Sequence, residues 1–185
     1  LDDALELGKK AVSLDESSPQ GHVILGNVYL WKKRHKKAIA EFEKAVSLNP
    51  NDADALSSLG GALVFSGLPE KALGYIEKAI RLNPNYPEYY IFTLGQAFFQ
   101  LKMYEEAVMA LRKSIIKNPN FMPAHYVLAA CYGYLGKQEF ARAKAEEVKR
   151  MIPGFSIKGS SEILPFKDED DFEHFAEGLR KAGLH

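Results

Sequence analysis

The sequence predicts an all-α fold of stacked antiparallel helix pairs, because three patterns recur along its 185 residues with one common spacing. The first pattern is a proline ladder at Pro50, Pro84, Pro119 and Pro153, in steps of 34, 35 and 34 residues. Two other ladders keep these steps: Leu25-Gly26, Leu59-Gly60, Leu94-Gly95 and Leu128-Ala129, and Ala38, Ala72, Ala107 and Ala141. Repeats of this length form one supersecondary unit each and bury their apolar faces by stacking on their neighbours.

Each repeat contains two predicted helices. In the first, Leu25 and Tyr29 lie four residues apart on one helical face, and in the second Phe42 and Ala45 keep a spacing of three. Pro50 ends the second helix because proline lacks a backbone donor and restricts the residue before it. The small residues of the ladders allow the two helices to approach closely.

Followed along the chain, the repeat divides the sequence into six segments. Residues 1–18 contain only a second helix whose first-helix partner is missing. The four full units are residues 19–52, 53–87, 88–121 and 122–155, with one extra residue near Pro87 in the 35-residue step. Residues 156–185 form a tail.

The unpaired helix at residues 1–15 is expected to expose Leu5, Val12 and their neighbours. Exposed apolar patches are sites of association, so we expect the chain to self-associate through this helix. The missing partner helix, together with a first residue that is Leu1 rather than Met, indicates a piece cut from a longer array.

The tail is predicted to begin as a linker around Gly159, Ser160 and Ser161, followed by an amphipathic helix at about 168–182. Asp168 is the expected N-cap, and Gly183 the expected stop. The apolar stripe of this helix consists of Phe172, Phe175 and Leu179.

Two positions are open to this C-terminal helix. A stack of hairpins needs a terminal element with a polar outer face, which favours a capping helix on the last second helix around Ala141, Ala145 and Val148. In the alternative, the tail enters the concave groove as an internal pseudo-ligand, with Ile163, Leu164 and Phe166 laid along it.

The Leu-Gly pairs, the tyrosines Tyr29 and Tyr132, the alanine ladder and the prolines resemble the tetratricopeptide repeat (TPR) family over residues 1 to about 155. The resemblance implies a right-handed superhelical solenoid that is not an enzyme. It also implies that the first helices line a concave groove, which binds a protein or peptide partner.

The repeat register then gives the partner-binding groove, whose residues are aromatic, small and nearly uncharged. Ile24 shares this inner face. The candidate site residues are Val23, Asn27, Trp31, Ser58, Phe65, Tyr89, Phe92, Gln96, Phe99, Tyr126, Ala130 and Tyr134. Such a surface suits an apolar or aromatic-bearing segment, either a helix or an extended peptide. Part of this set would instead be core between repeats, with even odds for Trp31 and Phe65.

One branch of the TPR family grips the C-terminal carboxylate of heat-shock chaperones with Lys, Arg and Asn at fixed inner positions. In one register these positions hold Val23, Asn27, Ser58, Tyr89 and Thr93, and in the next Ser57, Gly61, Thr93, Pro123 and Val127. Only Asn27 matches, and no cation is present to neutralise a carboxylate. The sequence therefore argues against a chaperone adaptor.

The tail "LPFKDEDDFEHFAEGLRKAGL" is similar to the segment that closes the repeat region of bacterial class III adenylate/guanylate cyclase-like proteins. This resemblance implies a non-catalytic, regulatory C-terminal arm of a larger protein. The alternative is the substrate-presenting repeat region of an enzyme such as a glycosyltransferase.

Composition limits the other function classes. The 24 basic and 24 acidic residues balance to zero, which argues against binding to nucleic acid or to a membrane surface. No apolar run approaches the roughly 20 residues of a membrane helix. A single cysteine and no visible signal peptide suit a reducing compartment, so we expect a cytoplasmic protein.

No catalytic, cofactor-binding or metal-ligating constellation is visible in the sequence. Cys131 falls inside the first helix of the last unit, where a buried core thiol is expected. His22 and His125 hold the same interior-facing position in their repeats, and we expect both to be packed in the core.

Overall fold

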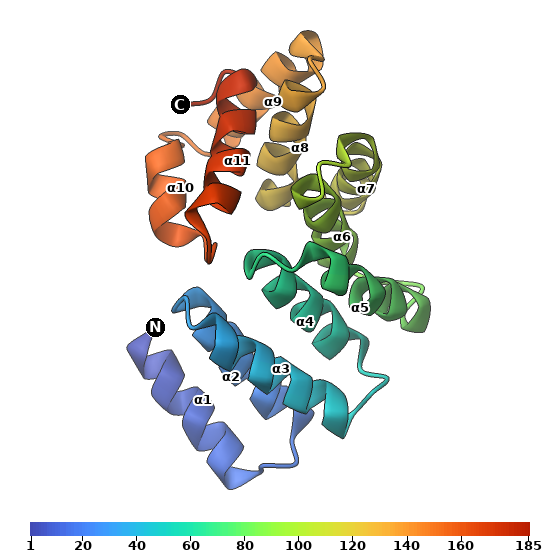
Figure 1. The fold of residues 1–185 in the computed structure, drawn as a ribbon, viewed down its shortest axis with the longest axis vertical. Coiled ribbons are helices and arrows are strands. Elements are labelled where there is room, and N and C mark those ends of the chain that lie inside the picture. The colour runs from blue at the N-terminus through green and yellow to red at the C-terminus, as the bar shows by residue number, and fades with distance from the viewer. The chain divides into compact units, whose positions relative to one another are not determined.

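The computed structural model describes residues 1–185 and contains eleven α-helices and no strand (Figure 1). The helices are α1 (Asp2–Leu14), α2 (Pro19–Trp31), α3 (His35–Leu48), α4 (Ala53–Phe65), α5 (Pro69–Leu82), α6 (Glu88–Gln100), α7 (Tyr104–Lys117), α8 (Met122–Tyr134), α9 (Gln138–Met151), α10 (Ile157–Ile163) and α11 (Glu169–Lys181). They form the stacked hairpins that the ladders predict.

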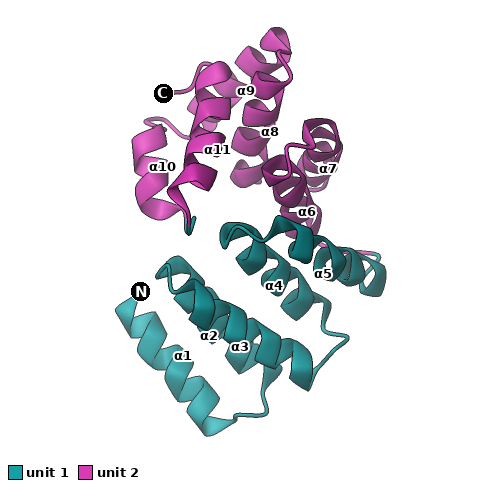
Figure 2. Cartoon of the chain, in the orientation of Figure 1, with its two compact units in different colours: residues 1–84, 165–167 teal, residues 85–164, 168–185 magenta.

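The chain divides into two compact units (Figure 2). Unit 1 comprises residues 1–84 and 165–167, and unit 2 comprises residues 85–164 and 168–185. In unit 1, α1 packs on α2, and the hairpins α2–α3 and α4–α5 stack through α3 and α4. In unit 2, the hairpins α6–α7 and α8–α9 stack through α7 and α8, and α11 packs on α8.

Close contact inside each of the first three full hairpins depends on one glycine of the first helix. A Cβ atom added at Gly60 would lie 2.5 Å from Cγ1 of Ile76, and one added at Gly26 would lie 2.9 Å from Cε1 of Phe42. Gly95 meets Leu111 in the same way, at 2.8 Å. The absent side chain therefore makes the space that the large residue of the second helix fills. The two partners are sixteen residues apart in every case.

The last hairpin solves the same problem differently. Ala129 takes the glycine position there, and Ala145, sixteen residues on, takes the position of the large side chain. Both alanines are buried. In this hairpin two methyl side chains, one on each helix, thus take the place of the glycine and the large side chain of the other hairpins.

The turn inside each hairpin also repeats in backbone conformation. One residue in each turn has a positive φ: Lys33 at 55°, Gly67 at 73°, Lys102 at 61° and Gly136 at 65°. Glycine adopts this left-handed conformation freely, whereas a residue with a Cβ does so at a cost of about 1–2 kcal/mol. The packing of the hairpins therefore offsets this cost at Lys33 and Lys102.

The first helix differs from the expectation of an exposed Leu5. Leu5 is only 6% exposed, and Gly8 on the same helix lies against Leu25 of α2. The exposed apolar side chains of this region are Leu1, Leu7 and Leu14, each at least 67% exposed. The expectation failed because α1 already has α2 as a neighbour and buries Leu5 on it.

The segment predicted as a linker forms the short helix α10 instead. Ser156 caps it, since its side-chain oxygen accepts a hydrogen bond from the backbone N–H of Gly159, and Ile157 is buried. Serine favours a helix N-terminus as much as a loop, and the sequence argument considered only the loop.

The predicted C-terminal helix is α11, with Asp168 at its N-cap position and Gly183 in a left-handed conformation after it. It packs on α8 far more than on any other helix, and not on α9 as a cap over Ala141, Ala145 and Val148 would. Those three α9 residues are buried in the α8–α9 hairpin. The preference for a cap at this place was therefore wrong.

Replacing Gly60 with alanine should lower the free energy of unfolding by about 1–3 kcal/mol, because the added methyl overlaps Ile76. In an Ile76→Ala background the same substitution should cost little, since the pair then matches Ala129 and Ala145. Urea unfolding of the four variants in a double-mutant cycle measures this coupling. Gly74→Ala, where the added atom meets nothing within 4 Å, is the control. Equal costs of Gly60→Ala in both backgrounds would contradict the proposed contact.

Candidate functional site

The twelve candidate residues lie on four first helices. Unit 1 holds Val23, Asn27 and Trp31 on α2 and Ser58 and Phe65 on α4. Unit 2 holds Tyr89, Phe92, Gln96 and Phe99 on α6 and Tyr126, Ala130 and Tyr134 on α8. The two sets differ in how much of them is open to a partner.

In unit 1, α2 carries an exposed apolar stripe. Ile24 is 53% exposed and Trp31 43% exposed, and the exposed Asn27 lies between them at a spacing of three and four residues. The Asn27 side-chain amide nitrogen donates to the Val23 carbonyl at 3.0 Å, and the side-chain oxygen takes no part in that bond. We call these three residues the α2 stripe.

Phe65, also in unit 1, is partly covered by the tail. Its ring centroid is 5.2 Å from that of Phe166 in an edge-to-face contact, and its carbonyl accepts a 2.9 Å hydrogen bond from the Lys167 backbone N–H. The expected pseudo-ligand is thus present only in part. Phe166 contacts a groove residue, whereas Ile163 is 66% exposed.

In unit 2, α11 occupies the surface that the sequence assigned to a partner. Phe175 of α11 has its ring 5.8 Å from Tyr126 and 6.2 Å from Phe99. A Cβ added at Gly178 would lie 2.8 Å from Cβ of Ala130, so glycine alone allows the two helices to touch there. We call the surface formed by Phe99, Tyr126, Ala130, Gly133 and Tyr134 the α8 groove.

The remaining unit 2 candidates belong mostly to the core. Phe92 is 9% exposed and contacts Phe121, which precedes α8, with ring centroids 5.1 Å apart. Tyr89 makes an edge-to-face contact with the buried Tyr90 at 4.9 Å. Gln96 is partly exposed on the same helix. Aromatic residues at inner register positions therefore serve packing between repeats as well as the groove.

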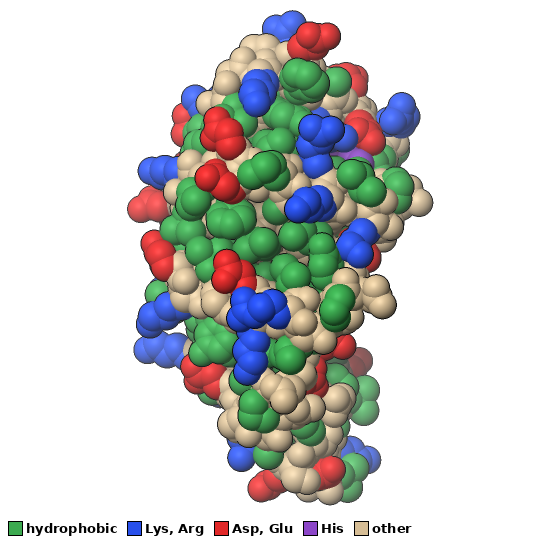
Figure 3. Space-filling model, turned by 90° about the vertical axis from the view of Figure 1, so that its right-hand side faces the viewer, with side chains coloured by type: hydrophobic (Ala, Val, Ile, Leu, Met, Phe, Trp, Pro, Cys, Tyr) green, Lys and Arg blue, Asp and Glu red, His purple; other side chains and the backbone are tan.

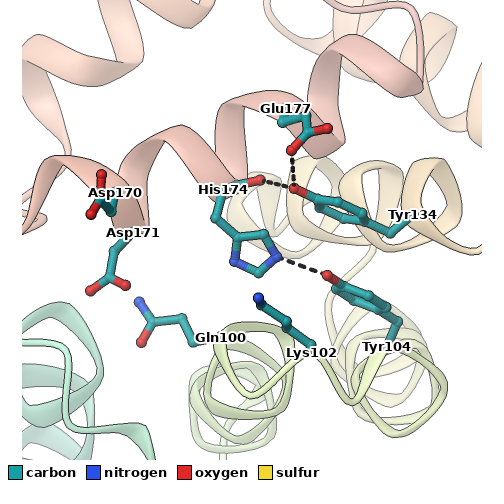
Figure 4. Close-up of a pocket in the computed structure, with 8 residues that line it drawn as sticks. All are labelled: Gln100, Lys102, Tyr104, Tyr134, Asp170, Asp171, His174 and Glu177. Atoms are coloured by element: carbon teal, nitrogen blue, oxygen red, sulfur yellow. Dashed lines mark hydrogen bonds between the residues drawn. The ribbon is translucent and has the colours of Figure 1, made fainter.

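A pocket of about 430 Å³ lies beside α11 in unit 2 (Figure 4). It is lined by Gln100, Lys102, Tyr104, Tyr134, Asp170, Asp171, His174 and Glu177. The His174 ring stacks on Phe99 at 4.7 Å, and its Nε2 lies 2.9 Å from the Tyr104 hydroxyl. The Tyr134 hydroxyl donates to the His174 carbonyl at 2.7 Å, with Glu177 Oε2 3.1 Å away as a second acceptor.

Burial sets the protonation of these groups. It raises the pKa of Tyr104 to about 12 and raises that of Tyr134 also, so both hydroxyls keep their protons. Burial, assisted by Lys102, lowers the pKa of His174 below its usual 6.5. The neutral ring with its proton on Nδ1 can accept the Tyr104 hydrogen bond at Nε2.

Sequence reasoning missed Tyr104 and His174. Tyr104 is the first residue of α7, a position that His35 holds in α3, and the search for groove residues considered first helices alone. The signal was available in the repeat itself. His35 is buried, with Nδ1 3.3 Å from the Ser66 hydroxyl at the end of α4, so this position reaches the next first helix.

The cysteine and the two histidines considered as candidates for chemistry lie in the core. Cys131 is fully buried, and burial raises the pKa of its thiol far above the usual range. His22 and His125 are both buried, and each has Nε2 near a carbonyl in the preceding turn, Glu16 at 3.1 Å and Pro119 at 2.9 Å. The expectation of packed histidines is confirmed. No group of three or more His, Cys, Asp or Glu side chains is arranged to hold a metal ion.

The charged side chains are mixed in sign. On the face drawn in Figure 3, acidic and basic residues are interspersed among apolar ones, without a large area of one sign. None of the eleven helices has the length and apolar character that crossing a membrane requires.

Two family models match this chain. One, described as anaphase-promoting complex, cyclosome, subunit 3, matches residues 31–113 and 67–148, and one described as tetratricopeptide repeat matches residues 1–53. The chain belongs to the tetratricopeptide repeat family.

Known relatives share the repeat over different lengths. Hsp70-Hsp90 organizing protein 3 of Arabidopsis thaliana is 32% identical over 90 residues, which cover 46% of this chain and 16% of that protein. The Cut9 and Hcn1 hetero-tetramer of the anaphase-promoting complex contains a chain with a TM-score of 0.79 at 18% identity, covering 98% of this chain and 33% of that one. YrrB, described as a TPR protein with an unusual peptide-binding site, has a TM-score of 0.63 at 21% identity, covering 97% and 92%.

Lowering the pH from about 7 to 5 should weaken the docking of α11 on the α8 groove. Because the pKa of His174 is below 6.5 in the docked state, the undocked helix binds the proton more readily, and protonation favours release. This stabilisation is complete above about pH 6.5 and is lost as the pH falls below that value. The pKa of Glu173 and of Glu177 is lowered by Arg180 and by Lys181 respectively, so these carboxylates titrate only below about 4.5.

Thermal unfolding followed by circular dichroism at pH 7, 6 and 5 measures the effect. The His174→Phe variant keeps an aromatic ring on Phe99 but cannot titrate, and its midpoint should fall less than that of the wild type over this range. Equal falls in the two proteins would show that His174 does not couple pH to docking.

Proposed function

We propose that this chain is a non-enzymatic protein-interaction scaffold, and that the α2 stripe with its neighbours on α4 binds an apolar or aromatic-bearing peptide or helix. The observation that carries the proposal is the exposure of Ile24 and Trp31 on α2, at positions that the repeat register assigns to the inner face of a first helix. Large apolar side chains left open at helical spacing are typical of interaction surfaces.

The chemistry of the α2 stripe suits a mixed ligand. Trp31 and Ile24 offer apolar area about two helical turns apart, and the Asn27 side-chain oxygen between them can accept a hydrogen bond from a ligand backbone. Val23 and Ser58, both partly exposed, extend the surface toward α4. An aromatic anchor beside a small number of polar groups is the composition of binding hot spots.

A carboxylate-terminated ligand fits less well. The relative named Hsp70-Hsp90 organizing protein 3 aligns with about half of this chain. However, Val23, Asn27 and Ser58 supply no positive charge to a bound carboxylate. We therefore propose an apolar ligand rather than a charged chain terminus.

Peptides selected on the full chain from a random display library should be rich in aromatic and aliphatic residues. Trp31→Ala should weaken their binding at least about tenfold, because truncation of a central aromatic anchor typically costs 2 kcal/mol or more. Fluorescence polarisation of the selected peptides gives the affinities. Met109→Ala, an exposed apolar residue of α7, is the matched control and should bind as the wild type does. Selection of acidic peptides that tolerate Trp31→Ala would refute the proposed site.

We also propose that the chain self-associates through α1, now by way of Leu7 and Leu14 rather than Leu5. Leu7 and Leu14 are 67% and 77% exposed and lie two helical turns apart. The double variant Leu7→Lys, Leu14→Lys should show a lower apparent mass in light scattering at high concentration. Ile116→Lys, equally exposed on α7 at 77%, should not. A wild type that is monomeric at every concentration would remove this proposal.

The narrower proposal is that the chain serves as a regulatory arm of a larger, nucleotide-cyclase-like protein. It is supported by the tail resemblance alone. The residues that carry this resemblance include Gly178, Leu179, Ala182 and Leu184, all of which are buried. The shared tail motif is thus a motif of helix docking, which suits a regulatory element and has no catalytic content. Sequencing the parent gene upstream of Leu1 tests it, and a parent without a cyclase domain would refute it.

A further inference from the structure

We propose that the α8 groove is a docking site for an amphipathic helix of a partner protein that carries an aromatic residue followed three positions later by glycine, and that α11 holds this site as a built-in competitor. The proposal rests on the scaffold function and gives the second unit its own partner chemistry. It is independent of the α2 stripe in unit 1.

The fit between α11 and the α8 groove defines this chemistry. Phe175 is 2% exposed and enters between Phe99 and Tyr126. One helical turn further on, a Cβ at Gly178 would lie within 2.9 Å of Ala130 and Tyr134. The groove therefore requires an aromatic ring and, three residues later, a residue without a side chain.

The groove contributes its own glycine to this contact. A Cβ added at Gly133 would lie 2.4 Å from the Gly178 carbonyl oxygen and 3.0 Å from Cβ of Lys181. Gly133 is part of α8, where glycine costs about 1 kcal/mol of helix propensity relative to alanine. A close backbone approach by a second helix is the physical reason for glycine at this position.

Four charged side chains of α11 pair with one another within the helix. Glu173 pairs with Arg180 at 2.5 Å and Glu177 with Lys181 at 3.0 Å, both within the helix and on exposed side chains. Acidic residues in its first turn and basic ones in its last favour the helix by themselves. On leaving the groove the helix keeps both ion pairs, and it loses the hydrogen bond from the Tyr134 hydroxyl to Glu177 and the contact of Lys181 with the Tyr134 ring.

The attachment of α11 combines apolar and polar contacts. Phe175, Ala176 and Leu179 of the helix are buried, as are Ala182 and Leu184 directly after it, and the hydroxyls of Tyr104 and Tyr134 form hydrogen bonds with His174. A partner helix with the same pattern would make the same contacts. α11 keeps one advantage, because its tether gives it an effective concentration in the millimolar range. The wild type should therefore bind such a partner weakly, and release of α11 should strengthen binding.

A fluorescein-labelled peptide of residues 168–185 is the probe, and fluorescence polarisation with the full-length chain is the measurement. Gly178→Leu in the chain should force α11 out of the groove, and this variant should bind the peptide at least about tenfold more tightly than the wild type. Gly74→Leu is the matched control, since Gly74 has open space around it, and it should bind as the wild type does.

Two further variants locate the binding. Adding Gly133→Leu to the Gly178→Leu chain should abolish peptide binding, and so should Gly178→Leu in the peptide itself. Trp31→Ala in the opened chain should leave the affinity unchanged, so that failure of the α2 stripe proposal and failure of this one remain distinguishable. Where Gly178→Leu lowers the helicity of the chain, His174→Ala with Phe175→Ala opens the groove without adding volume.

Three binding results would overturn the proposal. These are no binding by a folded opened variant, equal binding by wild type and opened variant, and binding that survives Gly133→Leu. Light scattering that finds the wild type as a dimer with exchanged tails would also overturn it, because the occupant would then be a second copy of this chain.

Discussion

The contact between a glycine of the first helix and a large side chain of the second sets the close approach of the helices in three of the four full hairpins, and two alanines replace it in the last. A Cβ at Gly60 would lie 2.5 Å from Cγ1 of Ile76, well below any normal contact, so the side chain of Ile76 fills the space beside this glycine. Burial of Ile76, Phe42 and Leu111 follows from this closeness, since each is fully buried in its hairpin. Within each unit, neighbouring hairpins stack through α3 and α4 or through α7 and α8.

Glycine also allows a close approach where α11 meets α8. Gly133 lies against the backbone of Gly178 rather than against a large side chain, and the second helix comes from outside the repeat. An end cap on α9 would have had no such contact to use, because the small residues of α9 already face α8. Close packing between glycines thus gives a more specific site than the open edge of the stack, and this explains why the tail lies on α8.

The helix pairs and their boundaries could be predicted from the sequence because each repeat carries the same pattern. Proline, Leu-Gly and alanine ladders report the same spacing independently, so an error in one would be exposed by the others. The tail sequence occurs only once, so no second copy could support a prediction of where it packs. The sequence alone did not show whether the tail would pack on α8 or on α9. The role of Gly133 and Gly178 becomes visible only in the structure, where they lie opposite each other. Ser156 is likewise compatible with a loop by sequence, and only the structure shows that its side chain caps α10.

The candidate site was predicted in part for the same reason. Register gives the helix face of a residue but not what lies against that face, so Phe99, Tyr126 and Tyr134 were found together whereas Phe92 proved to be core. Tyr104 escaped because inner positions were sought on first helices only. His174 escaped because its neighbours are 40 to 75 residues away in the chain, and only the docked tail brings it to Phe99.

The position of α11 after α8 in the chain has a consequence for the order in which the two helices are made. The α8 groove is complete once Tyr134 has been synthesised, and Lys181 follows 47 residues later. At about 5–20 residues per second, the groove exists for roughly 2–10 s before its own helix can reach it. During synthesis, then, a partner helix meets this surface without competition, and a complex formed on the nascent chain would be limited by its own dissociation rate rather than by displacement of α11.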